Sequence, residues 1–254
     1  SEYDKYLADP GFGVLNPIIK IIMPYFVGKM KHWDYAAAQR PDVMVGISQY
    51  VSNRIKKYYD RTASVLYPPV DAKRFKLQER KDDFYLVVGR QVPYKRVDLA
   101  VQACTTMGKR LVVIGEGSEN ENLKKMAGPT IEFKGRLNDK ETAEYYAKAK
   151  AFLFMAEEDF GITPLEAMAC GTPVIAYGFG GATETVKDGI TGFFFDRQTP
   201  ESLMNAIQRF EKTRLDPKKI RSHALTFDDM VFKKNFRTLV EREWKKHKKE
   251  MVNG

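Results

Sequence analysis

The chain has 254 residues, which allows one or two domains with a sizeable core. Its 43% hydrophobic and 30% charged residues are typical of a globular protein, and two distant cysteines, Cys104 and Cys170, exclude a disulfide framework and lack metal-ligand spacing. The net charge of +9 indicates an anionic partner, such as a nucleotide, a lipid phosphate, a membrane surface or a nucleic acid, without choosing among them.

The amino-terminal part of the chain holds an apolar stretch, two predicted helices and a linker. The stretch GVLNPIIKIIMPYFVG is interrupted by a lysine and two prolines, so it is too short and too broken to span a bilayer. We expect a buried helical segment, with an interfacial segment as the alternative. Residues 31–40 predict a helix, DVMVGIS predicts a short strand, and Ser48 is placed to cap a helix over residues 48–60. The prolines of SVLYPPVD then mark a linker, with a domain boundary between Val70 and Asp83.

From residue 83 onward, short apolar runs alternate with amphipathic segments. The predicted strands are residues 84–89, 110–115, 130–135, 151–155, 173–177 and 192–195. The predicted helices are residues 97–107, 119–127, 139–150, 164–170, 181–186 and 200–213. Ser118 and Asn138 are placed to cap the second and third of these helices. The alternation predicts one doubly wound α/β domain with a parallel sheet over residues 83–228.

Residues 230–250 predict a long amphipathic helix that ends in a run of lysines. Its apolar positions include Phe232, Phe236, Leu239 and Val240. Lysines at the end of a helix suit the helix dipole, so we expect a solvated helix terminus. Contact with a membrane surface is the alternative.

The segment EEDFGITPLEAMACGTPVIA carries two glutamates, Glu158 and Glu166, separated by seven residues. It follows a predicted strand, so it leaves the sheet at the carboxyl edge, where open α/β sheets bind ligands. One interpretation is structural: Thr163 caps a helix that begins at Pro164, and Glu166 completes a capping box. The other is functional: the helix start offers free N–H groups to an anion, Gly161 lets a phosphate approach, and a carboxylate accepts hydrogen bonds from sugar hydroxyls.

Two further loops leave the predicted sheet at the same edge. GRQVPYKRVD places Arg90 and Lys95 in a strand-to-helix loop, where two cations suit a diphosphate. GFGGATETV is a glycine-rich loop that runs into a short helix. Either loop alone is explained by solvated charges or by a flexible turn. Three such loops at one sheet edge indicate a site for a ligand with phosphates and hydroxyls.

Taken together, these motifs resemble a known family. Gly89-Arg90 with Lys95, VVIGEG, FKGRL, the glutamate pair and GGATETVKDGITGFFF are similar, in this order, to the donor-binding half of retaining glycosyltransferases of family 4, which have the GT-B fold. The resemblance covers about residues 83–228. Residues 31–75 resemble the end of the amino-terminal domain and the interdomain crossing of mannosyltransferases of this family, which build polysaccharides and often use GDP-mannose.

The resemblance implies roles for individual residues. Arg90 and Lys95 would bind the donor diphosphate and stabilise the leaving group, and Glu158 would contact the transferred sugar. Glu166 would hold the ribose hydroxyls. The remaining implied donor contacts are the backbone around Phe160, Gly161, Ile162 and Thr163, then Arg136 and Leu137 near the base, and, less closely matched, Gly181 with Glu184. No metal and no bound cofactor is implied, because the cationic pair serves the diphosphate and the chain has no Asp-x-Asp tripeptide.

The sequence departs from this family in its amino-terminal part. About seventy residues precede the linker, and they hold no counterpart of the amino-terminal domain's first strands, glycine-rich loop or active-site histidine. We therefore expect an amino-terminally truncated enzyme with three parts. Residues 1–75 would be a remnant of the amino-terminal acceptor domain and the linker, residues 76–228 the donor-binding domain, and residues 229–254 a helix that crosses back toward the amino-terminal domain.

Two functions stay open at this point. The first is retaining, metal-independent transfer of a sugar, with mannose favoured, from GDP-mannose or a UDP-sugar to a glycan or lipid-linked acceptor. The second is a donor-binding half that is inactive without a separate amino-terminal domain or another partner. The cysteine usage favours the cytoplasm, and a lipid-linked acceptor would add peripheral contact with the inner face of the membrane.

Two other classes of function are not expected. The basic residues are spread over loops and helix ends instead of alternating with aromatic residues along one face, so a nucleic-acid partner is not indicated. An oxidoreductase is not indicated either, because no G-x-G-x-x-G follows the first strand of the α/β domain.

Overall fold

The structure, a computed structural model, describes residues 17–253 and the side chains of residues 23–252. Its central feature is a six-stranded parallel sheet. The strands are β3 (Tyr85–Val88), β4 (Leu111–Ile114), β5 (Ile131–Gly135), β6 (Ala151–Phe154), β7 (Val174–Tyr177) and β8 (Gly192–Phe195). Their order is β5-β4-β3-β6-β7-β8, and all neighbours pair in parallel. The predicted doubly wound α/β fold is confirmed.

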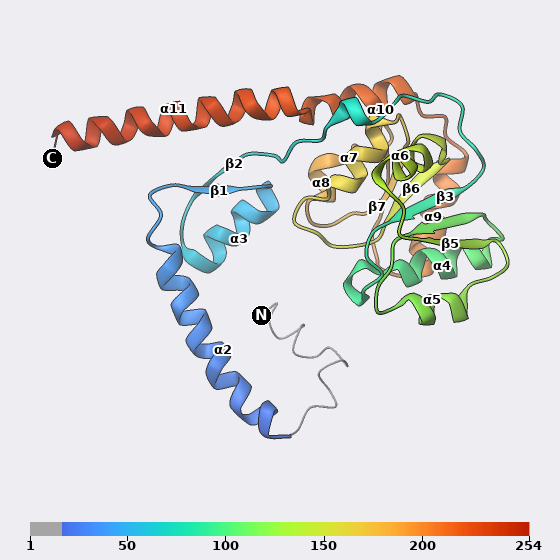
Figure 1. The fold of residues 1–254 in the computed structure, drawn as a ribbon, viewed down its shortest axis with the longest axis horizontal. Helices are drawn as coiled ribbons and strands as arrows, with labels where there is room; N and C mark the ends of the chain where they lie inside the picture. The colour runs from blue at the N-terminus through green and yellow to red at the C-terminus, as the bar shows by residue number, and fades with distance from the viewer. Residues whose placement is uncertain (1–16, 254) are drawn as a thin grey trace. The chain divides into compact units, whose positions relative to one another are not determined.

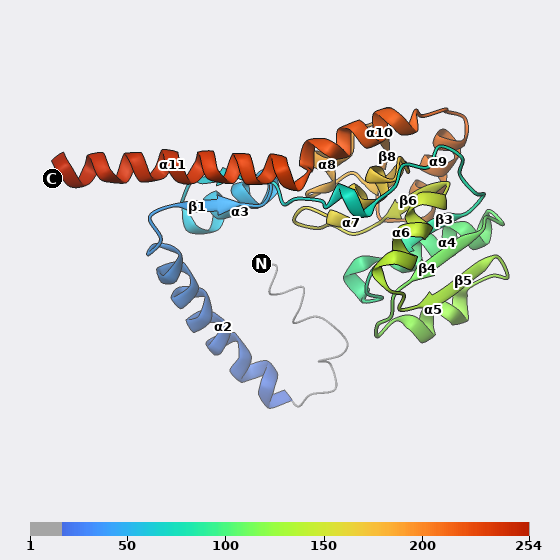
Figure 2. The same ribbon diagram turned by 45° about the horizontal axis from the view of Figure 1, so that its top comes forward.

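Helices cover both faces of this sheet (Figures 1 and 2). On one face lie α6 (Asp139–Lys148), α7 (Ile162–Ala169) and α10 (Pro217–Ala224), and on the other lie α4 (Val97–Thr106), α5 (Asn120–Met126) and α9 (Pro200–Glu211). Side chains alternate along each strand, so one strand serves both layers: Leu86 packs into the first core, whereas Tyr85 and Val87 pack into the second. The continuous apolar runs of the sequence are therefore strands buried on both faces.

The helix starts follow the sequence in part. Asn138 caps α6 in a capping box, in which its side chain accepts from the Glu141 N–H at 2.9 Å and the Glu141 carboxylate accepts from the Asn138 N–H at 3.1 Å. The prediction for Ser118 is wrong, because α5 begins at Asn120 and its N-cap is Glu119. The Glu119 N–H donates to a carbonyl of the loop after β3, and this bond sets where the helix begins.

Helix α10 falls in a stretch for which we predict no element. Pro217 begins it, and the Asp216 side chain accepts from the Lys218 N–H at 2.8 Å. The predicted long carboxy-terminal helix is confirmed as α11 (Asp229–Asn253). Its exposed side chains include Phe236 and Trp244. Within residues 17–253, every helix falls short of the length or the apolar character that crossing a membrane requires.

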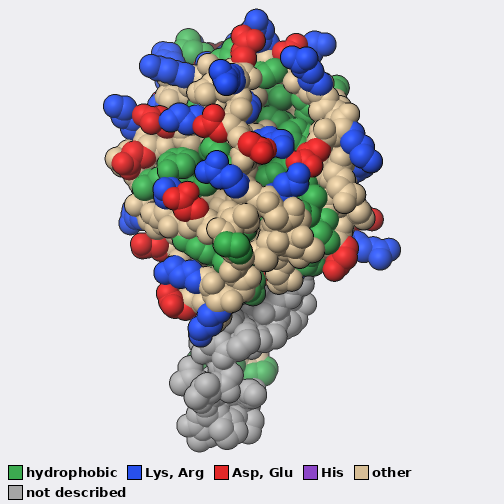
Figure 3. Space-filling model, turned by 90° about the vertical axis from the view of Figure 1, so that its right-hand side faces the viewer, with side chains coloured by type: hydrophobic (Ala, Val, Ile, Leu, Met, Phe, Trp, Pro, Cys, Tyr) green, Lys and Arg blue, Asp and Glu red, His purple; other side chains and the backbone are tan. Residues whose placement is uncertain are grey.

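The two cysteines add no charge to the protein at neutral pH. Cys104 and Cys170 are both free and buried, and burial raises the pKa of each thiol to about 12, so both stay protonated at neutral pH. On the face drawn in Figure 3, basic and acidic side chains are interspersed. That face presents no large patch of a single sign of the kind that attracts a nucleic-acid backbone.

Contacts between residues divide the chain into two units. One comprises residues up to Met44 together with residues 54–63, and it holds α2 (Pro17–Ala38). The other comprises residues 45–53 and residues from 64 onward, and it holds the six-stranded sheet. The boundaries that we place at residues 75 and 228 stay predictions.

Three short elements lie near this division in the sequence. Strands β1 (Met44–Gly46) and β2 (Ala63–Val65) pair with each other, and α3 (Gln49–Tyr59) lies between them along the chain. The predicted cap of α3 is confirmed, because the Ser48 hydroxyl accepts from the Val51 N–H at 3.0 Å.

The first unit is held together near the carboxyl end of α2. The Tyr59 hydroxyl donates to the Asp34 carboxylate at 2.7 Å, and the Arg61 guanidinium donates to the Ala38 carbonyl at 3.0 Å. The first residues of the apolar stretch lie outside the described ones. For its described part the expectation of burial is wrong, since Tyr25 is 61% and Phe26 54% exposed. The hydrogen bonds from Tyr59 and Arg61 are made near the other end of α2, at Asp34 and Ala38.

Candidate functional site

The strand order places one break in the winding of the sheet. From β3, near the centre, the chain moves outward through β4 and β5 and then returns to β6 on the other side of β3. The loops after β3 and β6 therefore leave neighbouring strands in opposite directions, which is where open α/β sheets form a ligand crevice. Arg90 and Lys95 follow β3, and Glu158 follows β6.

A cavity of about 510 Å³ opens at this edge of the sheet. Loops after β3, β4 and β5 contribute to its wall, together with α6 and α7. Its lining includes four of the predicted site residues, Arg90, Arg136, Leu137 and Glu166, together with Arg74, Gly115 and Tyr146. The fold thus brings together two predicted base contacts, one predicted phosphate contact and one predicted ribose contact.

The backbones of the loops after β3 and β4 are in close contact at a glycine of the second loop. Gly115 has φ +121, and a Cβ there would lie 2.1 Å from the Gly89 carbonyl oxygen. The buried Gln91 side chain ties the same loops, because it donates to the Gly115 carbonyl at 2.7 Å and accepts from the Asn120 side chain at 2.7 Å. The loop that carries Arg90 is therefore anchored by hydrogen bonds and close backbone packing.

Lys95 and Glu158 join the two loops of the switch point. The Lys95 ammonium is ion-paired and hydrogen-bonded to the Glu158 carboxylate. Both side chains are mostly covered, at 24% and 20% exposure, so solvent screens this pair only in part. Neither residue is among those that line the cavity. The structure therefore pairs the second predicted phosphate contact with the predicted sugar contact.

Helix α7 begins with a glycine instead of a capped threonine. Its N-cap is Gly161, with φ +83, and no side chain caps it. The prediction that Thr163 caps this helix and forms a capping box with Glu166 is wrong, because Gly161 turns the chain into the helix before Thr163. The N–H groups of this first turn, around Ile162, have no partner inside the helix, as an anion site requires. The Phe160 ring is buried in the core, so the predicted contact of this residue with a ligand would be made by its backbone.

The Glu166 carboxylate turns toward α6. Its Oε2 accepts from the Tyr146 hydroxyl at 3.0 Å, and among the described side chains this is its one hydrogen-bond partner. Burial raises the pKa of Glu166, whereas the hydrogen bond from Tyr146 and the positive charge of Arg74 oppose the rise. Arg74 is itself ion-paired with Asp139 at 2.7 Å. Glu166 is therefore a partly buried acceptor in the cavity wall.

The glycine-rich loop after β7 supports the loop after β6. The Gly181 N–H donates to the Glu158 carbonyl at 2.8 Å, and a Cβ at Gly181 would lie 2.3 Å from the Cα of Phe160. Gly181 is buried and is not in the cavity lining. Its position is that of a support behind the loop that carries Glu158.

Glu184, in α8 (Ala182–Thr185), holds the start of α3. Its carboxylate accepts from the Gln49 N–H at 2.7 Å and from the Tyr50 N–H at 2.9 Å. The Tyr50 hydroxyl in turn donates to the Glu157 carboxylate at 2.6 Å. Two hydrogen-bonded links therefore connect the first turn of α3 to the loops after β6 and β7.

The sequence analysis missed three residues of the site. Tyr146 lies in a predicted amphipathic helix, where an aromatic ring indicates core packing, and only the fold brings its hydroxyl to Glu166. Arg74 lies in the predicted linker, before the sheet begins. Gln91 directly follows Arg90 in the quoted loop, so its position was a visible signal although its burial was not.

Comparison with known sequences points in the same direction as this geometry. The family model described as Glycosyl transferases group 1 matches residues 69–226. An uncharacterised glycosyltransferase of Methanocaldococcus jannaschii is 30% identical over 176 residues, which are 67% of this chain and 50% of that protein. A GDP-mannose-dependent alpha-(1-6)-phosphatidylinositol monomannoside mannosyltransferase of Mycobacterium tuberculosis is 30% identical over 200 residues, 65% of this chain and 51% of that protein. The chain spans about half the length of these relatives.

Solved structures share the fold. A sucrose-phosphate synthase from Thermosynechococcus elongatus matches with a TM-score of 0.76 at 22% identity, over 85% of this chain and 62% of that chain. An Anabaena protein in complex with UDP-glucose matches with a TM-score of 0.73 at 20% identity, over 84% of this chain and 67% of that chain. These neighbours confirm the expected GT-B fold.

Proposed function

The chain belongs to the group 1 glycosyl transferases, and from this premise we propose that it binds a nucleotide-sugar and provides the donor side of a hexosyl transfer. The observation that carries the proposal is the meeting of Arg90 and Glu166 in one cavity at the switch point of the sheet. A guanidinium suits a phosphate, and a carboxylate suits sugar hydroxyls. In a nucleoside diphosphate the phosphates and the ribose hydroxyls are only a few bonds apart.

The phosphate end of the donor is proposed to lie between Arg90, Lys95 and the start of α7. Two cations and a row of free N–H groups would bind the diphosphate. The same groups would stabilise the negative charge that grows on the diphosphate as the bond to the sugar breaks. In this proposal Arg90 and Lys95 act without moving far, because the loop after β3 is anchored through Gln91.

We propose that the two carboxylates contact the ribose and the transferred sugar of the donor. Glu166 lines the cavity and would accept hydrogen bonds from the ribose hydroxyls. Glu158 follows the neighbouring strand and would contact the transferred sugar. Arg136 and Leu137, on the loop after β5, would lie against the base.

The finer proposal is transfer of mannose from GDP-mannose with retention and without a metal ion. The Mycobacterium relative is described as GDP-mannose-dependent and as a mannosyltransferase, which supports this donor and sugar. A UDP-sugar is the alternative donor, supported by the Anabaena neighbour in complex with UDP-glucose. A glycan or a lipid-linked molecule is the proposed acceptor, and a lipid-linked acceptor would place the chain at the inner face of the membrane.

The alternative function is a donor-binding half that needs a further domain or partner for turnover. The two functions differ in turnover alone, and the matched residues span about half of each relative's length. Nucleotide binding is common to both functions, so binding is the property to test first.

Titration calorimetry of the chain with GDP, UDP and ADP tests the proposal. We expect one nucleotide to bind, with affinity reduced about tenfold or more by Arg90→Ala and by Glu166→Ala, because each removes a charge-assisted hydrogen bond. Lys218→Ala, which removes an exposed cation that is not part of the cavity lining, should leave the affinity unchanged. Binding that survives both site substitutions would contradict the proposed site. Repeating the titration with EDTA tests metal independence.

A further inference from the structure

Two buried tyrosines of this domain each donate a hydrogen bond to a glutamate. Tyr85 donates to Glu211 at 2.9 Å, and Tyr146 donates to Glu166 at 3.0 Å. Both tyrosines are 1% exposed. The pairs are close in geometry, but their surroundings differ, and the difference indicates what the second pair does.

The Glu211 carboxylate is saturated with donors. Besides the tyrosine hydroxyl it accepts from Lys109 at 2.8 Å and from Lys150 at 3.1 Å. Burial alone would raise the pKa of Glu211, but these hydrogen bonds hold it at about 2. Glu211 is thus a structural charge whose hydrogen-bonding capacity is used within the protein.

The Glu166 carboxylate is held at one oxygen only. Oε2 accepts from Tyr146, whereas the described side chains provide no donor for Oε1, and the residue lines the cavity. A carboxylate can accept about four hydrogen bonds, so most of this capacity is left for a ligand. Glu166 is only partly buried and Oε1 is open to solvent, so a ligand that enters the cavity can donate to it.

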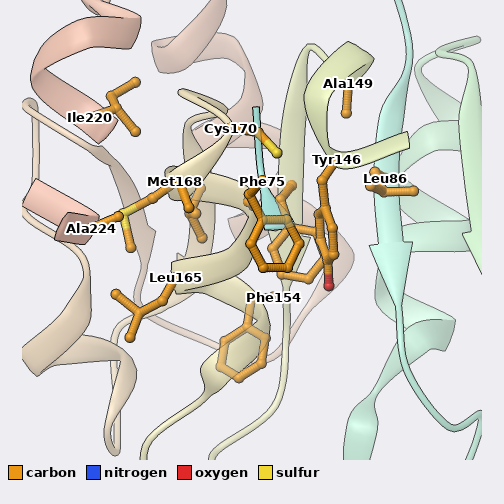
Figure 4. Close-up of a cluster of buried hydrophobic side chains, with 14 of the residues drawn as sticks. Phe75, Leu86, Tyr146, Ala149, Phe154, Leu165, Met168, Cys170, Ile220 and Ala224 are labelled. Atoms are coloured by element: carbon orange, nitrogen blue, oxygen red, sulfur yellow. The ribbon is translucent and has the colours of Figure 1, made fainter. Parts of the chain in front are cut away.

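The Tyr146 ring has little freedom to move. It packs edge-on against Phe75 at 6.1 Å and against Phe152 at 5.5 Å between ring centroids. Figure 4 shows the hydroxyl at the far end of this ring, with the Phe75 ring beside it. The Tyr146 carbonyl also accepts from the Thr172 hydroxyl at 2.6 Å, which fixes the backbone. The ring, and with it the hydroxyl oxygen, is therefore held beside Glu166.

We infer that Tyr146 is a positioning residue, which holds Oε2 of Glu166 so that Oε1 accepts hydrogen bonds from the ribose hydroxyls of the donor. The ribose part of this inference rests on the proposed function. Tyr146 itself touches no reacting atom, and its effect on binding passes through Glu166. The inference predicts that loss of the hydroxyl weakens those ligands that carry ribose hydroxyls and leaves other ligands alone.

A carboxyl titration tests the contact without any ligand. The carboxyl carbon of Glu166 is followed by ¹³C NMR against pH, with Glu166→Gln to assign it. Tyr146→Phe keeps the ring and removes the donor, so the pKa of Glu166 should rise; Tyr85→Phe, the matched variant at Glu211, should leave it unchanged. The other groups that act on Glu166 are Arg74, Asp139 and Cys170, and none of them is altered. An unchanged pKa in Tyr146→Phe would overturn the inference.

A pair of ligands tests the ribose part. UDP, GDP and ADP are titrated into the chain by calorimetry, and the tightest binder is compared with its 2′,3′-dideoxy form. We expect Tyr146→Phe to weaken the ribonucleotide about tenfold, the size of a charge-assisted hydrogen bond, and to leave the dideoxy form unaffected. Equal losses for both ligands would overturn the ribose part.

A second variant tests the inference if Tyr146→Phe does not fold. Glu166→Gln keeps the shape of the side chain, and it should lose the same ribose-dependent part of the affinity; undiminished preference for the ribonucleotide would overturn the inference. If the wild-type chain binds none of the three nucleotides, the proposed function fails and the ribose part fails with it. The carboxyl titration still decides in that case whether Tyr146 holds Glu166.

Discussion

Lys95 and Glu158 form an ion pair that joins the loop after β3 to the loop after β6. Lys95 is the predicted contact of the diphosphate, and Glu158 is the predicted contact of the sugar. A diphosphate that approaches Lys95 therefore meets a neighbouring negative charge and competes with it for the ammonium group. The pair therefore predicts that removal of the Glu158 charge affects a nucleotide and its nucleotide-sugar to different extents.

Glu158→Gln should raise the affinity for a nucleoside diphosphate about two- to fivefold, which is the size of an interaction between partly exposed charges. The gain should be smaller for the nucleotide-sugar, because the same substitution weakens the proposed sugar contact. Calorimetry with both ligands measures the two effects. Glu157→Gln is the control, since it removes the same charge one residue away, where the partner is Tyr50. Equal gains in the two variants would show that Lys95 is not the group concerned.

Gly115→Ala should lower the unfolding free energy by roughly 1 to 3 kcal/mol and weaken nucleotide binding, because a Cβ would meet the Gly89 carbonyl and displace the loop that carries Arg90. Gly108→Ala is the matched control. Gly108 also has a positive φ, of +62, but a Cβ there meets nothing within 4 Å. Urea unfolding and calorimetry on both variants separate strain from loop displacement. A Gly115→Ala chain that binds nucleotide normally would argue against the role of this contact.

Glu211→Gln should destabilise the domain by about 1 to 3 kcal/mol at pH 7, a range lowered for partial exposure of the carboxylate. The folded state holds the pKa of Glu211 at about 2, below the ordinary value of 4.5. The stabilisation is therefore complete above pH 4.5 and is lost as the pH falls toward 2. Urea unfolding at pH 7 and at pH 3 should show the difference between wild type and variant shrinking. Glu201→Gln, on the exposed first turn of the same helix, should show no such trend.

Glu184→Ala should loosen the first turn of α3. The Gln49 and Tyr50 N–H groups lose their acceptor, and caps of this kind contribute about 0.5 to 2 kcal/mol. Hydrogen exchange of these two amides should speed up in proportion, while amides of the six-stranded sheet keep their rates. Thr183→Ala alters an exposed residue of the same short helix and should change neither. Unchanged exchange in Glu184→Ala would mean that the cap contributes nothing to α3.

The fold could be predicted from the sequence because each buried strand appears there as a separate apolar run. The runs around Leu86, Leu153 and Ile175 are strands covered on both faces, and the alternation with amphipathic helices leaves a doubly wound sheet as the simplest arrangement. Helix ends were harder to predict. Asn138 caps α6 as predicted. Helix α7 instead begins after Gly161, which has a left-handed backbone, whereas the Thr-Pro pair two residues later had indicated a start at that pair.

Site residues could be predicted where the residues of a single loop indicate a ligand contact. They could not be predicted where the contact joins two segments that are distant in the sequence. Arg90 and Glu166 stand out as a cation and an acid beside predicted strand ends. The hydroxyl of Tyr146 acquires its partner only when α6 and α7 pack on the same face of the sheet. Glu184 was assigned to a glycine-rich loop near the ligand, and its contacts with α3 depend on a segment more than a hundred residues earlier in the chain.

The proposed function requires this sheet edge to bind a nucleoside diphosphate. The most direct test is a crystal structure of the chain grown with whichever of GDP, UDP or ADP binds in calorimetry. We expect the diphosphate between Arg90 and the start of α7, with the ribose hydroxyls within hydrogen-bond distance of Glu166 Oε1. A nucleotide bound elsewhere, or bound here with its ribose turned away from Glu166, would contradict it.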